Sequence, residues 1–276
     1  MSSVFNYIKG KSPIHALTGA SKLLVLVLWS LSAMTTFDTR LLVALPIISL
    51  LLFIASGIKY RDVSFVLNFT FVFMVLNNLL IFLFSPEHGV TIYGTRNVLW
   101  EGFGIWVVTK EQLFYQLNVV LKYLATIPLV LLFVTTTDPS EFASSLNRIG
   151  VSYKISYSVS LALRYIPDIQ REYKEISVAQ QARGLELDKK KESLFKRLKC
   201  AATLLFPLIV SSMERIEIVA AAMELRGFGK NKKRTWYSSR PFRKGDWIAI
   251  LFSILLLALS IALNFINGGR YYNPFV

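Results

Sequence analysis

The chain has 276 residues, of which 54% are hydrophobic and only 17% are charged, and its mean hydropathy is +0.49. Soluble globular proteins have about 25% charged residues, so this composition indicates an integral membrane protein. The net charge of +14 could suit nucleic acid, but the positive-inside rule and acidic lipid headgroups explain it more simply. The lipid bilayer is therefore expected as a partner, and nucleic acid is not.

Five apolar segments approach or reach the roughly 20 residues that cross a bilayer. The first two, Leu23–Phe37 and Leu41–Gly57, are short and lie only three residues apart. They form either a tight hairpin or a partly re-entrant pair. The other three are Val63–Phe84, Leu113–Thr135 and Trp247–Ile266. The predicted fold class is an all-α integral membrane protein with about five transmembrane helices.

Basic residues indicate the orientation, because short loops rich in Lys and Arg face the cytoplasm. They lie before the first segment, between the second and third, and between the fourth and fifth: Lys9, Lys11, Lys22, Lys59, Arg61 and the stretch 138–245. Five spans put all of them on one side. We therefore expect a multi-pass protein of a prokaryotic plasma membrane. Its N-terminus and the stretch 138–245 face the cytoplasm, and Ser85–Gln112 and the tail Asn267–Val276 face outward.

The chain divides into three predicted regions: transmembrane residues 1–137, a cytoplasmic region 138–245, and a C-terminal transmembrane helix and tail at 246–276. The middle region contains 21 Lys and Arg residues against 11 Asp and Glu residues. It begins with a helix start, Asp138 as N-cap, Pro139 at the first helical position and Glu141 at the third. Gly150 is expected to end this short helix.

Two long helices follow, one over roughly Tyr153–Arg183 and one from Lys189–Lys191 to Arg226. Gly184 and Gly227 come directly after the two arginines and are expected to end the helices. Each arginine continues an apolar stripe with helical spacing. The stripes are Ile166, Ile169, Tyr173, Ile176 and Ala179, then Ile216, Val219 and Met223. The pattern predicts two long crossed helices, each with an arginine at its tip.

A cation at a helix C-terminus gains only about 0.3–1 kcal/mol from the helix dipole, and one such arginine would need no further explanation. Two similar Arg-Gly helix ends, each on an apolar stripe, instead favour docking onto another protein, since the planar guanidinium group suits bidentate carboxylate recognition. The candidate docking residues are Ala182, Arg183, Gly184, Leu225, Arg226 and Gly227.

Other polar residues do not form a recognisable catalytic site. Glu172, Glu175, Arg171 and Lys174 are expected to be solvated or to pair within their own segment, and not to act in acid/base catalysis. The single cysteine, Cys200, excludes an internal disulfide, and the two histidines lie far apart without neighbouring ligands, so no metal site is expected. The sequence has no glycine-rich phosphate loop ending in Lys-Ser/Thr. We therefore expect no catalytic residue, no bound cofactor and no ATP hydrolysis by this chain.

Several motifs together give the chain a resemblance to a known family. They are Ser12–Leu17 followed by Lys22, Thr137–Glu141, Leu163–Pro167 followed by Glu172, Ala179–Gly184, and Ala222–Phe228. In this order and spacing, over nearly the whole chain, they resemble the transmembrane T component (EcfT/CbiQ-like) of energy-coupling factor (ECF) transporters. These transporters are vitamin and transition-metal importers of the ABC superfamily.

The resemblance implies a complex of four parts. Two cytoplasmic ABC ATPases bind ATP-Mg and hydrolyse ATP, a small membrane S component captures the substrate, and the T component couples them. The two coupling arginines of the family correspond to Arg183 and Arg226, each seated in one ATPase near acidic residues. The apolar surface of the long helices, including Ala201–Val210, is the candidate contact for the S component.

Two other classes stay open. One is the membrane subunit of another ABC transporter class, which would dock through one short coupling helix; two separate Arg-Gly tips argue against it. The other is an integral membrane enzyme, which would require a cluster of catalytic polar groups at the membrane interface.

Overall fold

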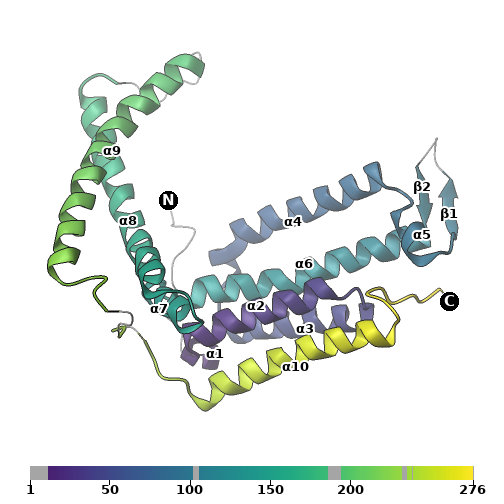
Figure 1. The fold of residues 1–276 in the computed structure, drawn as a ribbon. Helices are drawn as coiled ribbons and strands as arrows, with labels where there is room; N and C mark the ends of the chain where they lie inside the picture. The colour runs from purple at the N-terminus through teal and green to yellow at the C-terminus, as the bar shows by residue number, and fades with distance from the viewer. Residues whose placement is uncertain (1–11, 102–105, 186–193, 232–234, 238, 276) are drawn as a thin grey trace. The chain divides into compact units, whose positions relative to one another are not determined.

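The computed structural model describes residues 12–101, 106–185, 194–231, 235–237 and 239–275. These residues divide into two compact units (Figure 1). The bundle unit comprises Met1–Glu141 and Arg240–Val276, and the crossed-helix unit comprises Phe142–Ser239.

The bundle unit consists mainly of apolar helices. They are α1 (Pro13–Ala16), α2 (Gly19–Thr35), α3 (Thr39–Ala55), α4 (Tyr60–Phe84), α6 (Lys110–Thr136) and α10 (Lys244–Ile266). Among the described helices, α4, α6 and α10 are long and apolar enough to cross a membrane, whereas α2 and α3 have 17 residues each. The prediction of all-α membrane architecture is confirmed, with the first two apolar segments as short as the sequence indicated.

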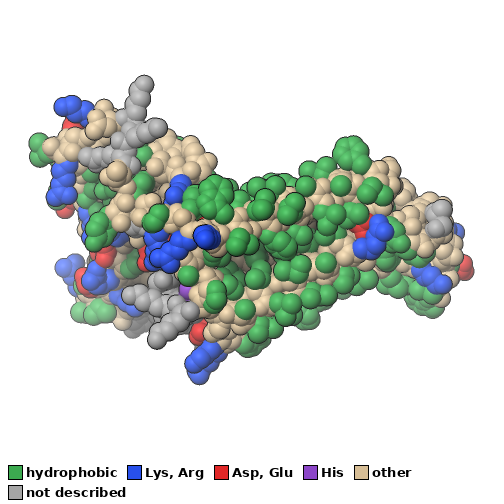
Figure 2. All heavy atoms as spheres, turned by 90° about the horizontal axis from the view of Figure 1, so that it is seen from below, with side chains coloured by type: hydrophobic (Ala, Val, Ile, Leu, Met, Phe, Trp, Pro, Cys, Tyr) green, Lys and Arg blue, Asp and Glu red, His purple; other side chains and the backbone are tan. Residues whose placement is uncertain are grey.

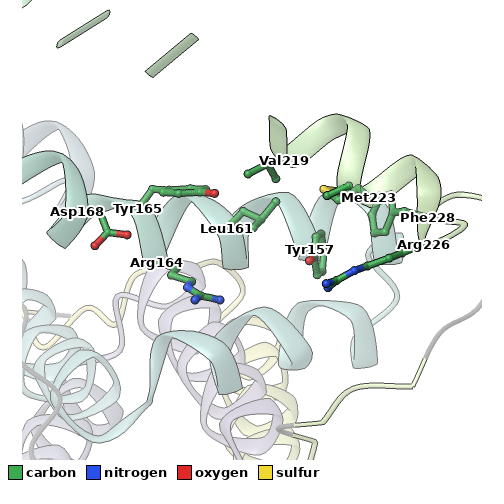
Figure 3. A pocket seen from close by; sticks show the side chains of 10 residues that line it. Tyr157, Leu161, Arg164, Tyr165, Asp168, Val219, Met223, Arg226 and Phe228 are labelled. Atoms are coloured by element: carbon green, nitrogen blue, oxygen red, sulfur yellow. The ribbon is translucent and has the colours of Figure 1, made fainter. Parts of the chain in front are cut away.

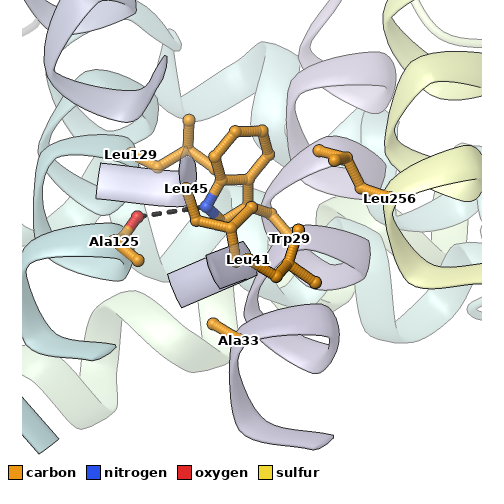
Figure 4. Close-up of a cluster of buried hydrophobic side chains, with 7 residues drawn as sticks. All are labelled: Trp29, Ala33, Leu41, Leu45, Ala125, Leu129 and Leu256. Atoms are coloured by element: carbon orange, nitrogen blue, oxygen red, sulfur yellow. Dashed lines mark hydrogen bonds between the residues drawn. The ribbon is translucent and has the colours of Figure 1, made fainter. Parts of the chain in front are cut away.

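The core of the bundle lies where α2, α3, α6 and α10 meet (Figure 4). It is built around the Trp29 side chain, which is 1% exposed. The other buried members are Ala33, Leu41, Leu45, Ala125, Leu129 and Leu256. Helices α2 and α3 both pack on α6, so the pair that the sequence left as a hairpin or a re-entrant segment is a helical pair supported by a longer helix.

The surroundings of Pro128 in α6 show how the bundle provides hydrogen bonds to its backbone carbonyl groups without water. A proline has no N–H to donate, so the carbonyl of Leu124, four residues earlier, loses its helical partner. The Ser49 hydroxyl from α3 donates to that carbonyl at 3.2 Å. The Trp29 indole donates to the adjacent Ala125 carbonyl at 3.1 Å. Neighbouring helices thus satisfy freed polar groups, as the interior of a membrane requires.

The surface of the bundle unit is also apolar. Figure 2 shows hydrophobic side chains over most of the visible face between its two ends, where charged side chains gather. Helix α4 has no buried residue in its most apolar 18-residue window, and it runs beside α6. Lipid contact explains an exposed apolar surface of this extent better than aqueous solvent does.

The segment after α4 contains structure that the sequence analysis left as a loop. It forms α5 (His88–Tyr93) and an antiparallel pair of strands, β1 (Val98–Glu101) and β2 (Val107–Thr109). Helix α5 lies so close to α6 that a Cβ at Gly89 would stand 2.5 Å from the Glu111 backbone. The buried Glu111 carboxylate accepts hydrogen bonds from Thr95 and Asn97, which fixes the chain between α5 and β1.

The remaining helices are α7 (Pro139–Arg148), α8 (Tyr153–Ala182) and α9 (Leu194–Leu225). The Asp138 carboxylate accepts a hydrogen bond from the Ser140 N–H at 2.8 Å, as an N-cap does. Helices α8 and α9 make up most of the crossed-helix unit and cross each other (Figure 1). The predicted start of the second long helix at Lys189–Lys191 lies outside the described residues.

Candidate functional site

Arg183 is the C-cap residue of α8, and the chain after it turns in a defined way. Gly184 has φ +88°, a left-handed conformation that a Cβ disfavours. Its N–H donates to the Gln181 carbonyl at 2.9 Å, and the Leu185 N–H donates to the Gln180 carbonyl at 3.0 Å. These two bonds make a Schellman motif, which satisfies the last carbonyls of the helix.

The end of α9 repeats both of these hydrogen bonds. Gly227 has φ +65°. Its N–H donates to the Glu224 carbonyl at 2.8 Å, and the Phe228 N–H donates to the Met223 carbonyl at 2.9 Å. Arg226 therefore occupies the same cap position as Arg183. The two Arg-Gly sequences encode one structural unit used twice.

Both tips present side chains to the surroundings. Ala182, Arg183, Gly184 and Arg226 are exposed, and Leu225 is 90% exposed. Within the described part of the chain, no hydrogen bond or ion pair engages the Arg183 side chain. A fully exposed leucine beside an exposed arginine is a combination of apolar and charge-assisted contact that suits a protein partner.

The Arg226 tip is held against the first half of α8. The Phe228 ring packs on Tyr153 and Tyr157, with ring centroids 5.5 and 4.8 Å away. Arg226 lines a pocket of about 410 Å³ together with Tyr157 and Arg164. Figure 3 shows its side chain directed toward the Tyr157 ring, with Arg164 on the same side. The end of α9 is thus positioned by aromatic packing that the sequence analysis did not identify, although Phe228 belongs to the predicted motif.

Glu172 joins the two helices where they cross. Its carboxylate accepts a hydrogen bond from Arg215 of α9 at 2.6 Å and another from the Ser211 hydroxyl. The prediction that Glu172 is solvated or pairs within its own segment was wrong, because the helix crossing brings Arg215 of α9 onto its carboxylate. The Glu172 side chain is only 17% exposed, so this pair is partly shielded from water.

The crossing is antiparallel, and this separates the two arginines. Arg226 lies beside Tyr157 and Arg164, near the start of α8, whereas Arg183 ends that helix. The 19 to 26 residues between these positions correspond to about 30–40 Å along α8, at about 1.5 Å per residue. The two tips are therefore well separated along α8.

An apolar stripe of exposed side chains runs along α9. It consists of Phe206, Ile209, Met213 and Ile216, which recur every three or four residues and are 71%, 56%, 58% and 65% exposed. Leu204 and Leu208, by contrast, are buried. Only part of the stripe falls within the predicted run Ala201–Val210, which the sequence analysis singled out by hydropathy alone. The 3-4 spacing is the signal that extends it to Ile216.

No group of three or more His, Cys, Asp or Glu side chains that could hold a metal ion occurs among the described residues.

Comparison with known proteins places the chain in a family. Three relatives are named energy-coupling factor transporter transmembrane protein EcfT. The protein of Exiguobacterium sibiricum is 28% identical, and the alignment covers 96% of this chain and 99% of the relative. Those of Streptococcus thermophilus and Staphylococcus aureus are each 27% identical, covering 95% and 94% of this chain and 97% and 96% of the relatives.

Residues 10–237 match the family model described as CbiQ, cobalt transport protein. This range contains α1 to α9 and both Arg-Gly tips. The chain belongs to the CbiQ family of cobalt transport proteins.

Proposed function

We propose that this chain is the transmembrane coupling subunit of an ECF-type ABC importer for a micronutrient, a vitamin or a metal ion. Two ABC ATPases dock at Arg183 and Arg226 from the cytoplasm, and a substrate-binding S component contacts the apolar stripe on α9. ATP-Mg binds to the ATPases, and this chain is not itself a catalyst. The relatives named EcfT support the assignment at the level of the transporter.

The observation that carries the proposal is the repeated Schellman end at the two ends of an antiparallel helix pair. Two equivalent helix ends about 30–40 Å apart, by the rise of about 1.5 Å per residue, fit two equivalent binding sites on partner proteins. A pair of ATPases offers one such binding site on each subunit. A subunit of another ABC class with one short coupling helix needs neither the second arginine nor the separation. A membrane enzyme would require neither tip.

Because the tips are exposed, each arginine is available for a charge-assisted hydrogen bond, and the energy of that bond gives the expected strength of docking. A charge-assisted hydrogen bond contributes about 1.5–3 kcal/mol, and about 1.4 kcal/mol corresponds to a tenfold change in affinity. Each Arg→Ala change should therefore weaken ATPase binding by roughly 10- to 100-fold. In the double variant both sites are lost, so ATP hydrolysis no longer drives uptake.

The test is purification of the tagged chain from its native membrane in mild detergent, followed by identification of the proteins that accompany it. We expect two ABC ATPase subunits and a small membrane protein with the wild-type chain. The Arg183→Ala/Arg226→Ala variant should retain the small membrane protein and lose the ATPases. Arg171→Ala is the matched control, because Arg171 is also exposed but pairs with Asp168 of its own helix. A double variant that keeps both ATPases would overturn the proposal.

A further inference from the structure

Two buried carboxylates meet at the N-terminus of α2. The first belongs to Asp246 in the opening turn of α10, which is completely buried. One of its oxygens accepts hydrogen bonds from the Thr18 N–H at 2.8 Å, the Thr18 hydroxyl at 3.1 Å and the Ser21 hydroxyl at 2.5 Å. The other accepts from the Arg243 N–H at 2.7 Å. Asp246 thus caps α10 and binds the start of α2 at the same time.

The second carboxylate is that of Glu141, in the opening turn of α7, and it is 7% exposed. It accepts a hydrogen bond from the Gly19 N–H at 3.0 Å. The Arg240 guanidinium group lies 3.9 Å from the same oxygen. Lys22, one turn into α2, donates to the Thr136 carbonyl at the last residue of α6 at 2.9 Å. Helices α2, α6, α7 and α10 are therefore joined at one place.

The charges of these groups suit their positions. The first N–H groups of a helix lack intrahelical partners, and the helix dipole favours negative charge beside them. Buried carboxylates are stable only when they are paired and hydrogen-bonded, and both carboxylates here accept N–H donors. Removing one negative charge would leave buried donors of α2 without a strong acceptor.

The cluster occupies a special place in the chain. Glu141 is the last residue of the bundle unit before the crossed-helix unit begins, and Arg240 is the first residue after that unit ends. On the first connection, the Glu141 carboxylate accepts from the Gly19 N–H at the start of α2. On the second, Arg240 lies 3.9 Å from that carboxylate.

We propose that Glu141 and Asp246, with Gly19, Thr18 and Ser21, form a rigid joint that transmits movement of the crossed-helix unit to the membrane helices. This inference rests on the proposed coupling function, and it assigns both carboxylates as positioning residues. The joint stays closed while the ATPases bind and release ATP. Loosening it leaves the ATPases docked and active but disconnects their movement from the bundle.

The experiment uses the complete complex in lipid nanodiscs, with nitroxide labels on cysteines in a Cys200→Ser background. One label pair, at Ser140 and Lys244, spans the joint. A second pair, at Glu217 and Lys59, reports movement between the two units. All four positions are exposed. Distances are measured by pulsed electron paramagnetic resonance without nucleotide and with ATP-Mg.

In the otherwise unchanged complex we expect the Ser140–Lys244 distance to be narrow and identical in both states, and the Glu217–Lys59 distance to shift with ATP-Mg. In Glu141→Gln and Asp246→Asn the first distribution should broaden and the shift of the second should disappear. ATP hydrolysis should stay within about twofold of its normal rate. Glu87→Gln is the matched control, because it removes an exposed carboxylate of the bundle unit that pairs with Arg96.

A nucleotide-dependent change across the joint in the unchanged complex would overturn the proposal, and this measurement does not require the variants to fold. Variants that keep the narrow distance and the full ATP-dependent shift would overturn it as well. Failure of the coupling function itself looks different. In that case the ATPases would stay bound to the Arg183→Ala/Arg226→Ala variant, and ATP-Mg would not shift the Glu217–Lys59 distance in any protein.

Discussion

Glu172 of α8 and Arg215 of α9 form an ion pair, with 2.6 Å between oxygen and nitrogen, at the point where the two helices cross. The pair lies between the Arg183 tip and the part of α8 that contacts the Arg226 tip. Because each tip lies at the end of a long helix, a small change of angle at the crossing displaces both. The position of the two tip arginines therefore depends on a contact far from either of them.

Breaking this pair should weaken the crossing. Glu172→Gln and Arg215→Gln each remove one charge, and together with their combination they form a double-mutant cycle. The double variant Glu172→Arg/Arg215→Glu reverses the pair. Partial solvent screening limits the loss, so a double-mutant cycle should give a coupling energy of about 0.5–3 kcal/mol. The measurement is the unfolding midpoint in a detergent titration, with ATPase co-purification as a second readout. Reversal should recover both; if reversal behaves like the single change, the pair does not set the crossing.

The helix-ending glycines should matter for docking even though they make no contact with a partner through a side chain. Gly184→Ala and Gly227→Ala place a Cβ at positive φ, which costs roughly 1–2 kcal/mol. The Schellman turn should open and the neighbouring arginine should lose its position, so ATPase co-purification should fall although both arginines are present. Gly269→Ala is the control, since Gly269 has ordinary φ and open space around it. Full ATPase recovery with both alanine variants would contradict a role for the turn.

Leu225 offers a separate test of the Arg226 tip. It is 90% exposed, so its replacement should leave the fold unchanged. Burial of a leucine side chain in a partner contributes about 1.5–3 kcal/mol, and Leu225→Ala should therefore weaken ATPase binding roughly tenfold or more. Ile218→Ala is the control, because Ile218 is 70% exposed on the same helix but lies two turns from its end. If the two changes weakened ATPase binding equally, the result would argue against a specific contact of Leu225 with the ATPase.

The sequence predicted most of the helices and both tips, because their signals are local. Apolar length predicts the spans, and an Arg-Gly pair after a helical stripe predicts a capped end. The pairing of Glu172 with Arg215, 43 residues later in the chain, could not be predicted. Neighbouring basic residues offered closer partners in sequence, and only the crossing brings α9 nearer. Tertiary contacts between charges leave no periodic signal.

Two further features depended on tertiary structure for different reasons. The buried bonds of Glu141 and Asp246 to the start of α2 link residues more than 100 positions apart. Their sequence signal, an acidic residue in the first turn of a helix, is explained equally well by capping alone. Strands β1 and β2 have only four and three residues, and their sequences, VLWE and VVT, are apolar runs without alternating polar positions. Such a strand pair has no signal that sequence periodicity could detect.

Changes in the apolar stripe on α9 should affect binding of the S component and leave binding of the ATPases unchanged. Phe206→Ser and Ile216→Ser replace exposed side chains on one face of the helix, so they should leave the unfolding midpoint unchanged. If the stripe binds the S component, loss of about 1.5–3 kcal/mol per buried side chain should release the small membrane protein while both ATPases stay bound. The arginine variants should give the opposite result. Val178→Ser, on the exposed face of α8, is the control. Loss of ATPases together with the small membrane protein would show that the stripe supports the whole unit and is not a separate docking surface.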